Sequence, residues 1–160
     1  MHATGGIRPL WGAPDLHHLV VRHTTPIDWI TSLPGVISQA ITTPDGYYVT
    51  GQPIQFALIA NPTKSISRRG HRSKITPLPP EEWKAWLDRK LTDAINLHTI
   101  DCAKLTAAEG KKPNMRSTHQ RVMFNGTGTV KNATALEHHL TNGVGRGKAY
   151  GCGLLLAEAA

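Results

Sequence analysis

The chain has 160 residues, 39% hydrophobic and 18% charged, which is typical of a folded globular protein and excludes a largely disordered one. No apolar run approaches the roughly 20 residues that span a bilayer, and the first residues lack the pattern of a secretory signal, so we expect a cytoplasmic protein without membrane contact. Eighteen Lys and Arg against eleven Asp and Glu give a net charge of +7, which favours a polyanionic partner, most simply nucleic acid.

The first half of the chain predicts strands. Residues 16–22 are mostly apolar and predict one strand. Residues 52–60 predict a second one, because apolar side chains alternate along it: Ile54, Phe56 and Leu58. The Asn-Pro pair at 61–62 ends this strand, since proline cannot donate to a ladder and restricts the residue before it.

Two clusters of basic residues follow. Residues 64–74 carry five basic residues and no acid, and a second cluster between 104 and 121 is broken only by Glu109. Such runs are often solvated faces, but two of them in a basic chain favour contact with nucleic acid. The residues that we assign to this contact are Lys64, Arg68, Arg69, Arg72, Lys74, Lys111, Lys112, Arg116 and Arg121.

The second half predicts the order β-α-β-β-α-β of a ferredoxin-like unit, beginning with an extended segment at residues 72–76. Pro80 fits the first position of a helix, with acidic residues in its opening turn. Apolar residues then recur at three- and four-residue spacing: Trp83, Trp86, Leu87, Leu91, Ala94 and Ile95. They predict one apolar stripe against a core. Stacking of bases on the tryptophans is the alternative.

Further along, residues 96–102 and 121–130 predict strands. A capping box at residues 134–137 predicts the start of a second helix, which Gly143 ends, and residues 153–157 predict a closing strand. The two cysteines, Cys102 and Cys152, lack C-x-x-C spacing and predict free thiols. We expect no metal site and no cofactor.

The loop before the closing strand contains five glycines in eleven residues, from Gly143 to Gly153. A Walker A motif needs Ser or Thr where this chain has Ala149, and a dinucleotide fingerprint needs glycine where it has Lys148. Glycine lets the backbone approach an anion, and the basic side chains add charge, so we assign phosphate contact to Gly143, Gly145, Arg146, Gly147 and Lys148. A plain helix-to-strand turn is the alternative.

The segments Q-R-V-M-F-N-G-T-G-T-V and G-V-G-R-G-K-A-Y-G-C-G-L-L resemble the C-terminal part of CasE, the CRISPR repeat-processing endoribonuclease of the type I-E Cascade complex and a member of the RAMP superfamily. The resemblance continues upstream through W-K-A-W-L-D-R-K-L, I-Q-F-A-L-I-A-N-P-T-K and R-P-L-W. It implies an α+β fold of tandem ferredoxin-like (RRM-like) units. We expect residues 1–64 to form an incomplete N-terminal unit, residues 65–71 a basic linker, and residues 72–160 the C-terminal unit.

The resemblance also implies a function: binding and metal-independent processing of precursor CRISPR RNA at repeat stem-loops, with the other Cascade subunits as partners. In the family, a strand and a helix that precede the segment R-P-L-W supply the catalytic histidine. We expect no counterpart of this strand and helix in the residues before R-P-L-W, so we assign no catalytic residue. His71 and His119 are expected to touch RNA rather than transfer protons. The alternatives are a non-catalytic subunit that binds the RNA hairpin, or a basic interaction protein of another kind.

Overall fold

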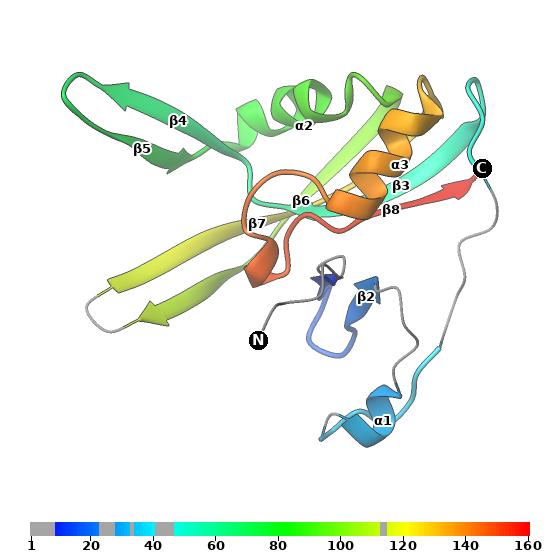
Figure 1. Cartoon of the computed structure of the whole chain (residues 1–160), viewed down its shortest axis with the longest axis horizontal. Coiled ribbons are helices and arrows are strands. Elements are labelled where there is room, and N and C mark those ends of the chain that lie inside the picture. Colours follow the sequence, from blue (N-terminus) through cyan, green and yellow to red (C-terminus); the bar gives the residue numbers. More distant parts are fainter. Residues whose placement is uncertain (1–8, 23–27, 33, 41–46, 113–114) are drawn as a thin grey trace, which may run out of the picture.

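A four-stranded antiparallel sheet forms the centre of the protein (Figure 1). In the computed structural model, which describes residues 9–22, 28–32, 34–40, 47–112 and 115–160, the strand order is β6-β7-β3-β8. The elements of this layer and its cover are β3 (Pro53–Ala60), η1 (Pro80–Glu82), α2 (Trp83–Leu91), β6 (Ile95–Lys112), β7 (Met115–Val130), α3 (Ala133–Asn142) and β8 (Leu155–Ala159). Both α-helices cover the same face of the sheet (Figure 1).

The predicted order β-α-β-β-α-β is present, but its first strand is β3. This strand lies inside the sheet, paired antiparallel with both β7 and β8. The assignment of residues 52–60 to a unit ending at residue 64, with residues 72–76 opening the next one, is therefore wrong. Residues 65–71 are no linker but part of the hairpin of β4 (Thr63–Arg68) and β5 (His71–Pro77), which is inserted between β3 and α2.

The apolar stripe predicted for the first helix is confirmed as core. All six of its residues are buried, and Trp86 is 3% exposed. The Trp86 ring stacks on Phe124 of β7, with centroids 6.0 Å apart and planes at 22°. Trp83 is also buried, and its indole N–H donates to the Leu78 carbonyl at 3.0 Å. Both tryptophans therefore serve packing, since both rings are buried in the core.

The second helix begins earlier than predicted. Asn132 is its N-cap, because the side chain accepts a hydrogen bond of 3.1 Å from the backbone N–H of Ala135. The helix start predicted from the capping box at residues 134–137 is therefore two residues too late. Asn132 already accepts from the amide of Ala135 and acts as the N-cap. The helix ends at Asn142 as expected, and Gly143 follows at a positive φ of 73°.

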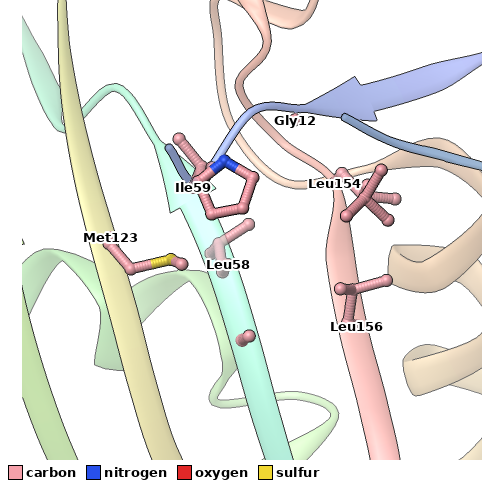
Figure 2. A pocket seen from close by; sticks show the side chains of 9 residues that line it. Gly12, Leu58, Ile59, Met123, Leu154 and Leu156 are labelled. Atoms are coloured by element: carbon pink, nitrogen blue, oxygen red, sulfur yellow. The ribbon is translucent and has the colours of Figure 1, made fainter. Parts of the chain in front are cut away.

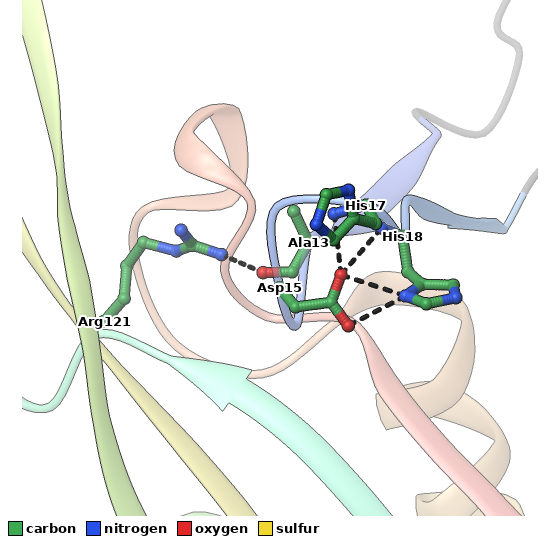
Figure 3. Close-up of polar contacts among 5 residues, drawn as sticks. All are labelled: Ala13, Asp15, His17, His18 and Arg121. Carbon is green, nitrogen blue, oxygen red and sulfur yellow. Dashed lines mark hydrogen bonds and ion pairs between the residues drawn. The ribbon is translucent and has the colours of Figure 1, made fainter.

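The N-terminal part lies at the face of the sheet that the helices leave open (Figure 1). It comprises β1 (Leu10–Gly12), β2 (Val20–Arg22) and α1 (Trp29–Ser32). A small apolar pocket, lined by residues that include Gly12, Ile59 and Leu154, marks where β1 meets β3 and the segment leading to β8 (Figure 2). The predicted strand at 16–22 shortens to β2, because Asp15 accepts bonds from the amides of His17 and His18 in a turn (Figure 3).

Two hairpins project beyond the central sheet at the same end of the molecule (Figure 1). One is the hairpin of β4 and β5. The other is the distal part of β6 and β7, where β7 has lost its pairing with β3 and continues with β6 alone. The loop between α3 and β8 lies near the base of both hairpins (Figure 1). No helix in the described ranges has the length and apolar composition to cross a membrane.

Candidate nucleic-acid interface

The glycine-rich loop, residues 143–153, is packed in its first part. Val144 is 2% exposed, and its N–H donates to the Gly153 carbonyl at 2.9 Å. The N–H of Gly153 in turn donates to the Ile59 carbonyl of β3 at 2.6 Å. These bonds fix the loop to the sheet, and they turn the amides of Val144 and Gly153 away from any ligand.

The second part of the loop lines a cleft of about 450 Å³, whose other walls come from β5, from β7 and from Asn61 directly after β3. The lining residues are Asn61, Ile75, His119, Gly145, Arg146, Gly147 and Lys148. Arg146 is exposed and Lys148 half-buried. A β-bridge between Asn61 and Arg146 holds the loop against the end of β3. Four of the five predicted loop residues thus line one cleft. The fifth, Gly143, is the C-cap of α3 instead.

Asn61 and His119, which line the cleft, form a connected group with Tyr150 of the loop. Asn61 is 5% exposed, and its amide Nδ2 donates to Nδ1 of His119 at 3.3 Å. The His119 ring stacks on Tyr150 of the loop, with centroids 3.9 Å apart and planes at 21°. Burial lowers the pKa of His119 below its ordinary value, which favours the neutral ring. Neither Asn61 nor Tyr150 was predicted as a site residue, although Asn61 is the polar residue that ends an apolar strand.

The basic residues of the β4–β5 hairpin do not all face this cleft. In its register Ser65 pairs with Ile75 and Ile66 with Lys74, so Lys64 and Lys74 lie on the face opposite to Ile75. Lys64 Nζ pairs with the Glu82 carboxylate at 3.0 Å. Arg69 is exposed between the strands. The side chains of Arg68, His71 and Arg72 lie outside the described residues.

The basic residues of the second cluster lie in two separate places. The backbones of Lys111, Lys112 and Arg116 lie at the far end of the β6–β7 hairpin, and their side chains lie outside the described residues. Arg121 is half-buried, and its Nη2 donates to the Ala13 carbonyl (Figure 3). This contact ties β7 to the N-terminal hairpin. The RNA contact expected of Arg121 stays a prediction.

The predicted free thiols are confirmed, with Cys102 half-buried and Cys152 buried. Burial raises the pKa of Cys152 to about 11, so this thiol is protonated at neutral pH. Within the described ranges, no three His, Cys, Asp or Glu side chains gather in a way that could hold a metal ion.

The β-α-β-β-α-β sheet, the glycine-rich loop and the projecting hairpins together define a ferredoxin-like protein with a basic cleft. Residues 12–158 match the family model described as CRISPR associated protein, and the chain belongs to this family. Within it, the chain is a member of the CasE group, with which it shares the α+β fold predicted from the sequence.

Three relatives illustrate the similarity. The CRISPR system Cascade subunit CasE of Escherichia coli strain K12 is 31% identical over 118 residues, which are 66% of this chain and 57% of that protein. The alignment thus spans little more than half the length of this relative. The structure of CRISPR endoribonuclease Cse3 bound to 19 nt RNA matches with a TM-score of 0.77 and 29% identity, over 94% of this chain and 80% of that one. Thermus thermophilus Cse3 bound to an RNA representing a pre-cleavage complex matches with a TM-score of 0.73 and 28% identity, over 94% and 78%.

Proposed function

We propose that this protein binds and processes precursor CRISPR RNA at repeat stem-loops, as a cytoplasmic subunit of a type I-E surveillance complex. The observation that carries the proposal is the cleft, in which Arg146 and Lys148 stand on a loop that buried hydrogen bonds hold in place. Similar structures are those of CRISPR endoribonuclease Cse3 bound to 19 nt RNA and of Cse3 bound to an RNA representing a pre-cleavage complex.

The cleft suits an RNA backbone for electrostatic reasons. Arg146 and Lys148 bring two positive charges to one side of it, and the adjacent Gly145 and Gly147 add no side chains that would keep a phosphate away. Phosphate groups gain charge-assisted hydrogen bonds from such cations, which are shorter and stronger than neutral ones. No Asp or Glu is among the residues that line the cleft, so an anion meets no repulsion there.

The processing step follows from the resemblance to the CasE family. The ribose 2′-OH attacks the neighbouring phosphate, the 5′-oxygen of the next nucleotide leaves, and a cyclic phosphate remains on the first. Negative charge grows on the phosphate during this step, and Arg146 and Lys148 would stabilise it. The residues that take up and return the proton are not assigned.

The binding half of the proposal is tested with a CRISPR repeat stem-loop that carries a 2′-deoxy nucleotide at the scissile position. We expect salt-sensitive binding of this hairpin and weaker binding of an unpaired RNA of the same length. Lys148→Ala should weaken binding and reduce the salt slope by about one released counterion. Equal affinity for both RNAs would indicate a basic protein without hairpin specificity.

The processing half is tested separately with the all-ribose stem-loop in buffer that contains EDTA. Product with a cyclic phosphate end supports the endoribonuclease. Tight binding of the hairpin without any product supports the second candidate, a subunit that only holds the RNA. The lining of the cleft favours this second candidate. Its described residues supply cations and hydrogen-bond donors for binding, but only one histidine, His119, that could transfer a proton.

A further inference from the structure

We propose that His119 contacts the RNA backbone as an uncharged donor, presenting Nε2–H to a phosphate held beside Arg146 and Lys148. This inference rests on the proposed function and names one contact within it. His119 lies on β7 opposite Ala108, directly past a register shift in which β6 carries one extra residue. Such a bulge turns the side chains next to it, and here the His119 ring joins the cleft lining.

The hydrogen bond with Asn61 decides which ring nitrogen carries the proton. Asn61 Nδ2 lies 3.3 Å from Nδ1 of His119, and because an amide N–H can only donate, this orientation of the amide pairs with a lone pair on Nδ1 and with the proton of the neutral ring on Nε2. Asn61 is 5% exposed and directly follows β3, where it is bridged to Arg146. The residue that sets the tautomer is therefore itself fixed by the sheet and the loop.

Two further contacts hold the ring in this position. Tyr150 covers one face of His119 at a centroid distance of 3.9 Å, which leaves the Nε2 edge as the ring's polar group for the cleft. Gly147 lies against the Asn61 amide, since a Cβ on this glycine would be 3.6 Å from Nδ2. Loop, amide and imidazole form one packed unit.

A neutral donor fits this place better than a third cation. Arg146 and Lys148 line the same cleft, and a positive imidazole beside them would be repelled and would lose hydration on burial. A neutral N–H still donates to a phosphate oxygen without these costs. Because the contact is uncharged, it should add affinity without releasing a counterion.

The tautomer is measured first, on the protein labelled with nitrogen-15 in its histidines. Long-range proton–nitrogen correlation spectra at pH 7.5 show which ring nitrogen is protonated, and the His119→Gln spectrum assigns the signal by its loss. We expect the neutral ring with the proton on Nε2. A charged ring, or a proton on Nδ1, overturns the proposal.

Binding of the 2′-deoxy stem-loop is then compared across three variants of His119. Gln places an amide N–H near the position of Nε2, Asn places one near Nδ1, and Phe keeps a stacking ring without a donor. We expect His119→Gln to bind nearly as the unchanged protein does, and the Asn and Phe variants to bind about tenfold more weakly. The salt slope should stay the same in all three, in contrast to Lys148→Ala.

The outcomes separate this inference from the proposed function. If the unchanged protein binds the hairpin and His119→Phe binds it equally well, the His119 contact is refuted and the RNA-binding function stands. If the slope falls by about one in His119→Gln, the ring is charged and the proposal is wrong. If the unchanged protein does not bind the hairpin, both fall. Circular dichroism confirms that the Gln and Phe variants are folded, so that weaker binding is not the result of unfolding.

Discussion

Replacing Gly145 by alanine tests whether the glycine-rich loop is anchored on the core. Gly145 has a φ of +76°, and a Cβ built there would lie 3.1 Å from Cζ2 and 3.2 Å from Cη2 of Trp86. The indole is 3% exposed and is stacked on Phe124, so it has little room to withdraw. Alanine therefore meets a backbone conformation that it disfavours and a contact that is too close.

The cost follows from these two effects. A residue with a Cβ loses about 1–2 kcal/mol in the left-handed region. Forcing an extra carbon into a packed core costs about 1–3 kcal/mol. Together they destabilise the Gly145→Ala variant by about 2–5 kcal/mol, which for a chain of 160 residues lowers the melting temperature by roughly 5–20 °C.

Gly147→Ala is the matched control. Gly147 has a similar φ of +85°, but a Cβ there would meet its nearest atom, Cβ of Cys152, at 3.4 Å, an ordinary contact. Only the backbone cost of about 1–2 kcal/mol applies to this variant. Thermal and urea unfolding followed by circular dichroism measure both. If the two variants lose the same stability, Trp86 does not pack against the loop and the reasoning is refuted.

Three further predictions concern the core, an ion pair and the thiols. Trp86→Ala should lose about 3–5 kcal/mol in urea unfolding, because a large core aromatic is removed; a variant of unchanged stability would favour base stacking instead. The hydrogen bond from His139 at 2.9 Å holds the pKa of Asp93 below 3.8. The ionised Asp93 therefore stabilises the folded state above pH 3.8, and this stabilisation is lost as the pH falls through the lowered pKa of the folded state. Asp93→Asn should have a slightly lower melting temperature than the unchanged protein at pH 6 and the same melting temperature near pH 2. Iodoacetamide at pH 8 should modify Cys102 before Cys152, whose buried thiol has a pKa raised to about 11; peptide masses that show Cys152 modified first would contradict this.

The sequence predicts those parts of the fold that depend on local periodicity. The stripe from Trp83 to Ile95 and the alternation along residues 52–60 both report which side chains are buried, because each period belongs to one kind of element. The partner of a strand is a different matter. β3 shares its sheet with strands more than 60 residues away along the chain, such as β7, and a hairpin interrupts the path between β3 and α2. No local pattern carries that information.

The candidate site divides in the same way. Gly145, Arg146, Gly147 and Lys148 are adjacent in the chain, and composition alone marks them. His119 enters the cleft because β6 has an extra residue next to the Ala108–His119 pair, and it meets Asn61 only because β3 and β7 are neighbours. Charge counting, in turn, overestimates the interface, since strand alternation places Lys64 and Lys74 away from the cleft.

The unequal lengths of the strands have a mechanical consequence. β6 and β7 have 18 and 16 residues, whereas β3, which supports them, has eight. Beyond Val122, β7 continues paired with β6 alone, and the register shift between Leu105 and Ala108 lies close to that point. A two-stranded ribbon is marginally stable by itself, and a bulge at its root weakens the ladder there. Past the contacts that hold His119 to Asn61 and Tyr150, the ladder of β6 and β7 can therefore open while the rest of the domain stays folded, and its amide protons will exchange with solvent before those of the sheet at its base.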